Sequence, residues 1–219
     1  MAPPGSAALF ALRPYFNPER RSPVHIVPGL CGVILTLTMV LFTAIALVRE
    51  RERGNLELLI TTPVRPVELM VGKILPYVAI GYVQVTLILT LGRVLFDLPF
   101  LGSPLDLAVG AGVFVAASLT LGLFISTAAQ TQFQAFQMTF TSFLPQIMLS
   151  GYMFPFEGMP RPAQWLAEIF TLTHFLRIVR GIVLRGASLG DVSGEIWPLA
   201  AFLAVTLTLA ALRFRKRLD

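Results

Sequence analysis

The chain has 219 residues, of which 55% are hydrophobic and only 13% are charged, and its mean hydropathy is +0.75. Soluble domains carry about 25% charged residues, so this composition excludes a disordered chain, a collagen-like fibre and an ordinary soluble enzyme. The net charge of +5 does not indicate nucleic-acid binding, because the 17 Lys and Arg residues lie between long apolar runs, as in loops that face anionic headgroups. The composition therefore predicts an all-α membrane protein.

Five apolar stretches are long enough to cross the hydrocarbon core as helices, which takes about 20 residues each. They cover residues 26–48, 74–95, 107–128, 136–154 and 196–212. The fourth is short and contains Pro145 beside Gln146. We therefore expect a polytopic bundle of about five transmembrane helices.

The basic residues predict how this bundle is oriented. Five crossings place the two termini on opposite sides of the membrane. The side with loops 49–73 and 129–135 and the C-terminal tail carries nine basic residues, whereas the other side carries eight over roughly twice the length. The positive-inside rule then favours a cytoplasmic C-terminus.

The segment after the first span, residues 49–63, is charged at its start and apolar along one edge. Its charged residues recur at the three- and four-residue spacing that pairs side chains on a helix: Arg49, Glu50, Glu52, Arg53 and Glu57. Pro63 then ends the helix. We expect an amphipathic cytoplasmic helix. It is either a solvated helix end at the headgroups or a docking element for a soluble partner.

Residues 155–195 form a long loop on the outer side that is too apolar for a solvated tether and too charged to span the membrane. Short helices that lie at or dip into the interface fit this pattern, with Trp165 at headgroup depth. Re-entrant backbone is tolerated only where protein or a water-filled cavity covers it. The loop is therefore a candidate outer lid of a translocation path, and a plain interfacial hairpin is the alternative.

No catalytic or metal site stands out in the sequence. The five spans hold no Asp, Glu, Lys or His well inside them, there is no H-E-x-x-H zinc motif, and Cys31 is the only cysteine. Gly72-Lys73 is followed by Ile74 and does not complete a phosphate-binding P-loop, so another chain would have to hydrolyse ATP. Gln84 and Gln146 remain as polar candidates to line a path or to bond across helices.

Five strings, in order along nearly the whole chain, resemble the permease subunit of ABC-2 type transporters, the membrane half of ATP-driven exporters. They are residues 15–30, 49–63, 72–77, 149–160 and 175–186. Residues 49–59 are similar to the family's cytoplasmic R-E-x-E-x-G-T-x-E-x-L signature, with Asn55 where the family usually has Thr. Each string is weak alone, but five in this order favour the family strongly.

The resemblance implies roles for particular residues. The R-E-x-E segment of that family touches the ATPase subunit, which implies a coupling role for Arg49, Glu50, Glu52, Gly54, Glu57 and Pro63. The strings after the fourth span resemble the family's re-entrant outer helices, which would include Pro155, Trp165, Arg180 and Gly181.

The resemblance also implies a function. The chain would be a non-enzymatic permease subunit of an exporter in the bacterial inner membrane, in contact with lipid, and would form the translocation path with a second copy or a paralogue. It would bind no cofactor and no nucleic acid; ATP and Mg would belong to a separate ATPase subunit. A non-transporting membrane anchor or scaffold is the alternative.

The family begins with a further span and an outer domain, whereas only about 14 residues precede Tyr15 in this chain. We therefore expect residues 1–25 to be the remnant of an outer segment. Residues 26–219 would be the transmembrane domain without its first helix.

Overall fold

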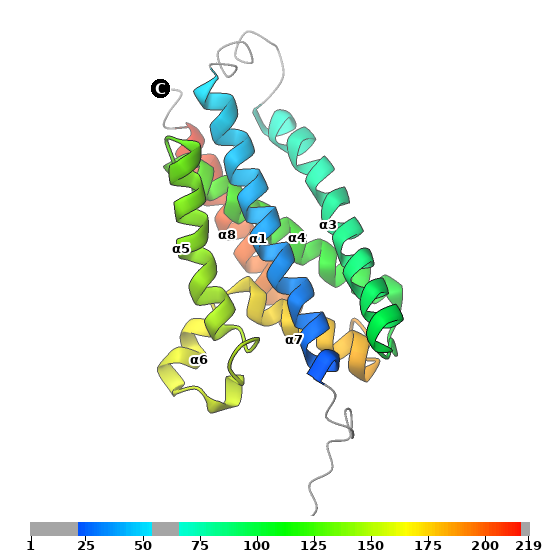
Figure 1. Ribbon diagram of the computed structural model, residues 1–219. Helices are drawn as coiled ribbons and strands as arrows, with labels where there is room; N and C mark the ends of the chain where they lie inside the picture. Colours follow the sequence, from blue (N-terminus) through cyan, green and yellow to red (C-terminus); the bar gives the residue numbers. More distant parts are fainter. Residues whose placement is uncertain (1–21, 54–65, 216–219) are drawn as a thin grey trace, which may run out of the picture.

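The computed structural model describes residues 22–53 and 66–215. Every regular element in these ranges is helical (Figure 1), which confirms the all-α prediction. The elements are α1 (Ser22–Glu52), α3 (Pro66–Phe96), α4 (Pro104–Ala128), α5 (Gln132–Leu149), the 3-10 turn η1 (Phe156–Gly158), α6 (Arg161–Ala167), α7 (Thr171–Arg185) and α8 (Ser193–Arg215).

Within the described ranges, four helical segments are long and apolar enough to cross a membrane. They are Ile26–Glu52, Leu75–Phe96, Pro104–Ala128 and Ser193–Arg213, and they match four of the five expected spans. A polytopic helical membrane protein is therefore confirmed.

The fifth expected span, residues 136–154, corresponds to α5, whose limits and polarity differ from the expectation. The helix begins at Gln132 and ends at Leu149, because the chain turns at Gly151, which has a left-handed φ of 83°. With 18 residues it is about as long as a thin hydrocarbon core, but amide and hydroxyl side chains interrupt its apolar surface: Gln132, Gln134, Gln137, Thr139, Thr141, Ser142 and Gln146. It lies beside α1 and runs antiparallel to it (Figure 1).

Helices α1 and α4 form the centre of the bundle. Helix α1 contacts α3, α4, α5 and α7, and α4 contacts α3, α5, α7 and α8 as well. In their most apolar windows, 56% of α1 and 61% of α4 are buried, compared with 22% of α3 and 17% of α8. The outer surfaces of α3 and α8 are therefore apolar and exposed, as expected of helices that face lipid.

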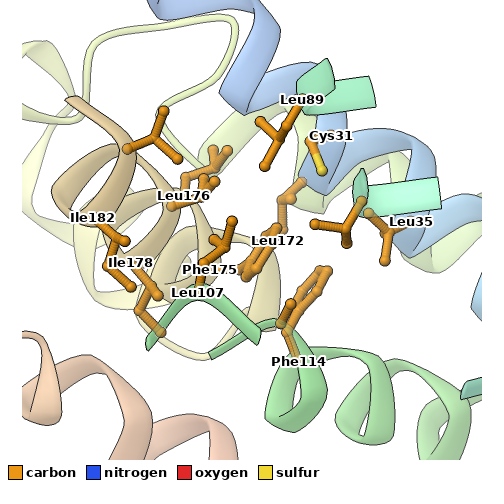
Figure 2. Packing of buried hydrophobic residues seen from close by; sticks show 14 of the residues in the cluster. Cys31, Leu35, Leu89, Leu107, Phe114, Leu172, Phe175, Leu176, Ile178 and Ile182 are labelled. Atoms are coloured by element: carbon orange, nitrogen blue, oxygen red, sulfur yellow. The ribbon is translucent and has the colours of Figure 1, made fainter. Parts of the chain in front are cut away.

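The main apolar cluster lies where α7 packs against α1 and α4 (Figure 2). Phe114 of α4 and Phe175 of α7 stack face to face with ring centroids 4.0 Å apart. Cys31 and Leu35 of α1 and Leu172 of α7 are fully buried in the same cluster. The short helix α7 is therefore part of the core and not an appendage on its surface.

Glycines on α4 let its neighbours approach closely. A Cβ atom at Gly122 would lie 2.6 Å from the carbonyl oxygen of Val40 in α1, and one at Gly110 would lie 2.8 Å from the Cγ2 atom of Ile178 in α7. Small residues at such positions allow helix backbones to pack tightly in lipid.

Candidate functional site

The charged side chains of the bundle gather at its two ends. One end holds the last turn of α1, the start of α5 and the end of α8; the other holds η1, α6 and α7 (Figure 1). The first end contains the described part of the segment that the sequence assigns to coupling. The second contains the predicted outer loop.

At the first end, Arg51 and Glu52 attach α1 to the junction between α4 and α5. The Nη1 atom of Arg51 donates to the carbonyl oxygens of Ser126 and Ala129, at 3.1 and 2.9 Å. These carbonyls belong to the C-terminal end of α4, where a positive charge is favourable. The carboxylate of Glu52 accepts hydrogen bonds from the backbone N–H of Gln132, at 2.8 Å, and from its side-chain amide. A negative charge is favourable at this N-terminal end of α5.

The contacts of this end differ in part from the sequence-based expectation. Glu52 does not pair with Arg49 inside the helix, but reaches the neighbouring helix instead. Arg49 is exposed and Glu50 is half-buried. Arg51 was not a candidate residue, although it forms the bonds to α4. Gly54, Glu57 and Pro63 lie outside the described residues, and their coupling role stays a prediction.

The α4–α5 junction is shaped to receive these two side chains. Helix α4 ends at Ala128, and α5 begins only a few residues later with Thr131 as its N-cap. The Thr131 hydroxyl accepts from the backbone N–H of Gln134 at 3.2 Å, which stabilises the first turn of α5. The last carbonyls of α4 and the first N–H of α5, which have no partner within their own helices, therefore lie close together next to the end of α1.

At the second end, α7 is buried along nearly its whole length. Its only side chains that are not buried are those of Arg177, Arg180 and Arg185. Arg177 bridges Glu168, which precedes α7, and Glu195 in the first turn of α8, with its Nη1 atom 3.0 and 3.3 Å from their carboxylate oxygens. The guanidinium also lies over the ring of Phe156, 4.6 Å from its centroid. These contacts tie η1, α7 and α8 together.

His174, one turn before Arg177, is also held by Glu168 and Glu195. Its Nδ1 atom is 2.6 Å from Oε2 of Glu195, and its Nε2 atom is 2.9 Å from the carbonyl oxygen of Glu168. The Glu168 carboxylate lies 3.7 Å away from Nε2. Burial alone lowers the pKa of His174, but the hydrogen bonds and charges of Glu195 and Glu168 outweigh it and raise that pKa above its ordinary value.

The predicted outer-loop residues occupy two different environments. Pro155 and Trp165 are exposed around η1 and α6, and the exposed fraction of Trp165 is 73%. Arg180 and Gly181 lie on α7. Arg180 donates to the carbonyl oxygen of Gly151 at 3.2 Å, and burial lowers its pKa. Gly181 is buried against Val192, 3.2 Å from where its Cβ would be. A shared role for these four residues stays a prediction.

The two polar residues predicted inside the spans bond across helices. Gln84 of α3 accepts from the hydroxyl of Thr38 in α1 at 2.9 Å. Gln146 of α5 is 2% exposed and accepts from the hydroxyl of Thr171 in α7 at 3.4 Å. A role for either residue in lining a path stays a prediction.

Comparisons with known proteins find a matching family model and several similar chains. The family model described as "ABC-2 type transporter" matches residues 6–184. The chain is 35% identical, over 209 residues, to "Probable multidrug ABC transporter permease YbhR" of Escherichia coli (strain K12), which covers 94% of this chain and 56% of the relative. It is 31% identical, over 208 residues, to "Probable multidrug ABC transporter permease YbhS" of the same strain, which covers 94% of this chain and 55% of the relative.

A more distant relative comes from another organism. The chain is 25% identical over 184 residues to "Linearmycin resistance permease protein LnrN" of Bacillus subtilis (strain 168), which covers 83% of this chain and 48% of the relative. The chain thus spans about half the length of the curated relatives it matches.

Proposed function

Because the chain belongs to the ABC-2 type transporter family, we propose that it serves as a permease subunit of an ATP-driven exporter in the bacterial inner membrane. Four membrane-length helices around a buried core support this role. Under this proposal the Arg49–Glu52 end and the C-terminus face the cytoplasm, where a separate ATPase subunit binds ATP and Mg. A second copy or a paralogue of this chain completes the path.

The observation that carries the proposal is the attachment of α1 to the α4–α5 junction. The segment after α1 resembles the family's ATPase-contacting signature, and the last turn of α1 bonds to the end of α4 through Arg51 and to the start of α5 through Glu52. A displacement of residues 49–63 by the ATPase would therefore move the cytoplasmic ends of α1, α4 and α5 together.

This displacement would reach the outer end through α7. Helix α7 packs against both α1 and α4, so a tilt of those helices changes the surface that holds it. We place the outlet of the path beneath residues 155–195, where α7 and the η1–α6 segment close the outer end of the bundle.

The names of the relatives support an organic compound as the exported substrate. YbhR and YbhS are named as probable multidrug permeases, and LnrN as a linearmycin resistance permease. A path walled by the apolar side chains of this bundle would suit a compound that partitions into lipid.

Copurification tests the proposal and separates it from the scaffold alternative. When the chain is tagged in its native host and purified, a P-loop ATPase should copurify with it in stoichiometric amount. Glu57→Arg should reduce this retention at least tenfold while the variant stays in the membrane, because it reverses a charge in the predicted contact. A chain that retains no ATPase would favour the membrane anchor or scaffold.

A further inference from the structure

A pocket of about 280 Å³ opens between α3 and α4. One side is a stripe along α3 at helical spacing: Tyr82, Val85, Thr86, Leu89, Thr90 and Arg93. The other side is the start of α4, with Pro104, Leu107 and Ala108, and Phe100 of the connecting loop closes it. Apart from one phenol, two threonines and Arg93, this lining is apolar.

Helix α3 contacts both α1 and α4 around Gly81 and Gln84, and the pocket opens further along α3, where the helix stays against α1. Gly81 lies against Val115 of α4, whose Cγ2 atom is 2.9 Å from where a Cβ would be. Nearby, the hydroxyl of Tyr82 donates to the carbonyl oxygen of Ala108 at 3.0 Å. Three turns later, Gly92 packs against Val27 of α1, 2.6 Å from where its Cβ would be. Helix α3 is thus held to α1 there, and the space beside α4 stays open.

Arg93 is the single ionised residue that lines the pocket. Its side chain is exposed and makes no hydrogen bond or ion pair with any residue that the structure describes. The two acidic residues closest to Arg93 in the sequence, Asp97 and Asp106, do not line the pocket. Asp106 instead accepts a hydrogen bond from the backbone N–H of Leu189 at 3.3 Å. A lone cation at the mouth of an apolar groove complements an amphiphile with an anionic head.

The dimensions of the groove match one leaflet of a bilayer. The eleven steps from Tyr82 to Arg93 correspond to about 16 Å along a helix, and half of the hydrocarbon core is about 15 Å. Arg93 lies in the last turn of α3, so its guanidinium reaches headgroup depth when the apolar stripe lies in the core.

We propose that the α3–α4 pocket binds one anionic phospholipid. One acyl chain lies along the α3 stripe above Tyr82, and the phosphate pairs with Arg93. The proposal requires only that the chain lies in a membrane, and it does not depend on coupling to an ATPase.

Retention of lipid by the purified full-length chain tests the proposal. The chain is extracted in detergent, supplied with phosphatidylglycerol or with phosphatidylcholine of the same acyl chains, and analysed by native mass spectrometry. We expect one phosphatidylglycerol per chain, retained roughly tenfold better than phosphatidylcholine, because the choline cation offsets the phosphate charge.

Two variants act on different parts of the pocket. Arg93→Gln removes the cation and should abolish the preference for phosphatidylglycerol. Thr90→Trp fills the groove from an exposed position and should reduce retention of both lipids. Arg161→Gln removes an exposed cation on α6, outside the pocket, and should retain lipid like the wild type.

Three outcomes would overturn the proposal. Equal retention of the two lipids by the wild type would show that the charge of Arg93 does not select the lipid. Unchanged retention in Arg93→Gln, in a variant that elutes as the wild type on size exclusion, would place the lipid elsewhere. Displacement of the lipid by inorganic phosphate alone would show that the acyl chain contributes nothing.

Discussion

At the residue scale, the geometry around His174 requires a shared proton. The carbonyl oxygen of Glu168 can only accept, so Nε2 of His174 must donate to it. In a neutral ring, Nδ1 would then face Oε2 of Glu195 with a lone pair at 2.6 Å. A proton between the two atoms removes this repulsion, and the imidazolium fits both contacts. Arg177 faces the same two glutamates, so the proton joins an existing network of opposite charges.

His174 therefore makes stability depend on pH. Its pKa is raised in the folded chain, so its contribution is complete below the unfolded value of about 6.5 and is lost as pH rises through the folded pKa. We expect the Tm of the wild type in detergent to fall, relative to that of His174→Gln, as the pH rises above about 6.5. Parallel Tm curves for the two proteins would contradict this role.

Arg51 allows a test of the attachment at the opposite end. Arg51→Gln removes the cation from the carbonyls of Ser126 and Ala129, two bonds to a helix end, and should destabilise the chain by about 1–2 kcal/mol in thermal unfolding. Arg53→Gln removes an exposed cation two residues later and should change stability by less than about 0.5 kcal/mol. Equal losses of stability in the two variants would mean that the hydrogen bonds from Arg51 to α4 do not stabilise the chain.

At the element scale, the contact between α1 and α4 depends on the missing side chain of Gly122. Gly122→Ala would press a methyl group against the backbone of Val40 and should destabilise the bundle by about 1–3 kcal/mol. Gly72→Ala is the matched control, because no described atom beyond its own turn of α3 lies within 4 Å of its Cβ position, and it should be neutral or slightly stabilising. Thermal unfolding in one detergent compares the two. A Gly122→Ala chain as stable as the Gly72→Ala chain would contradict the close approach.

The four strongly apolar helices could be predicted from the sequence because hydropathy alone distinguishes them. The limits of α5 could not, since its polar side chains weaken the apolar signal and Gly151 turns the chain earlier than hydropathy indicates. The side-chain partners of α7 could not be predicted either. The pattern of residues 155–195 predicted short helices that lie at or dip into the interface, but not that Arg177 and Arg180 bond to Glu168, Glu195 and Gly151. A single sequence does not show which distant residues will meet.

The same limit applies to the candidate site. The charged run after the first span was recognisable by its density and by its likeness to a family signature. The local spacing suggested pairs inside one helix, whereas Arg51 and Glu52 bond to α4 and α5. The signal that could have indicated these partners is the short connection from Ala128 to Gln132, which leaves free carbonyls and N–H groups between two helices.

At the scale of the whole molecule, the few charged side chains form three groups, each of which makes different contacts. The Arg49–Glu52 end holds three helices together, the outer end locks α7 to α8, and Arg93 marks the pocket between α3 and α4. Between these regions the surface is apolar, as on the outer sides of α3 and α8. Under our proposal, export is driven by ATP hydrolysis on a partner subunit that binds at one end of the bundle.

A cross-linking experiment tests this central claim most directly. Cys31 is the only cysteine and is fully buried, so Glu57→Cys and the control Glu157→Cys, on the exposed turn η1, each add one thiol to which a photoreactive maleimide is to be attached. In native membranes with equal amounts of both variants, we predict that position 57 cross-links to a P-loop ATPase and that position 157 does not. Absence of this product at position 57, or equal yields at both positions, would contradict the coupling of this chain to an ATPase.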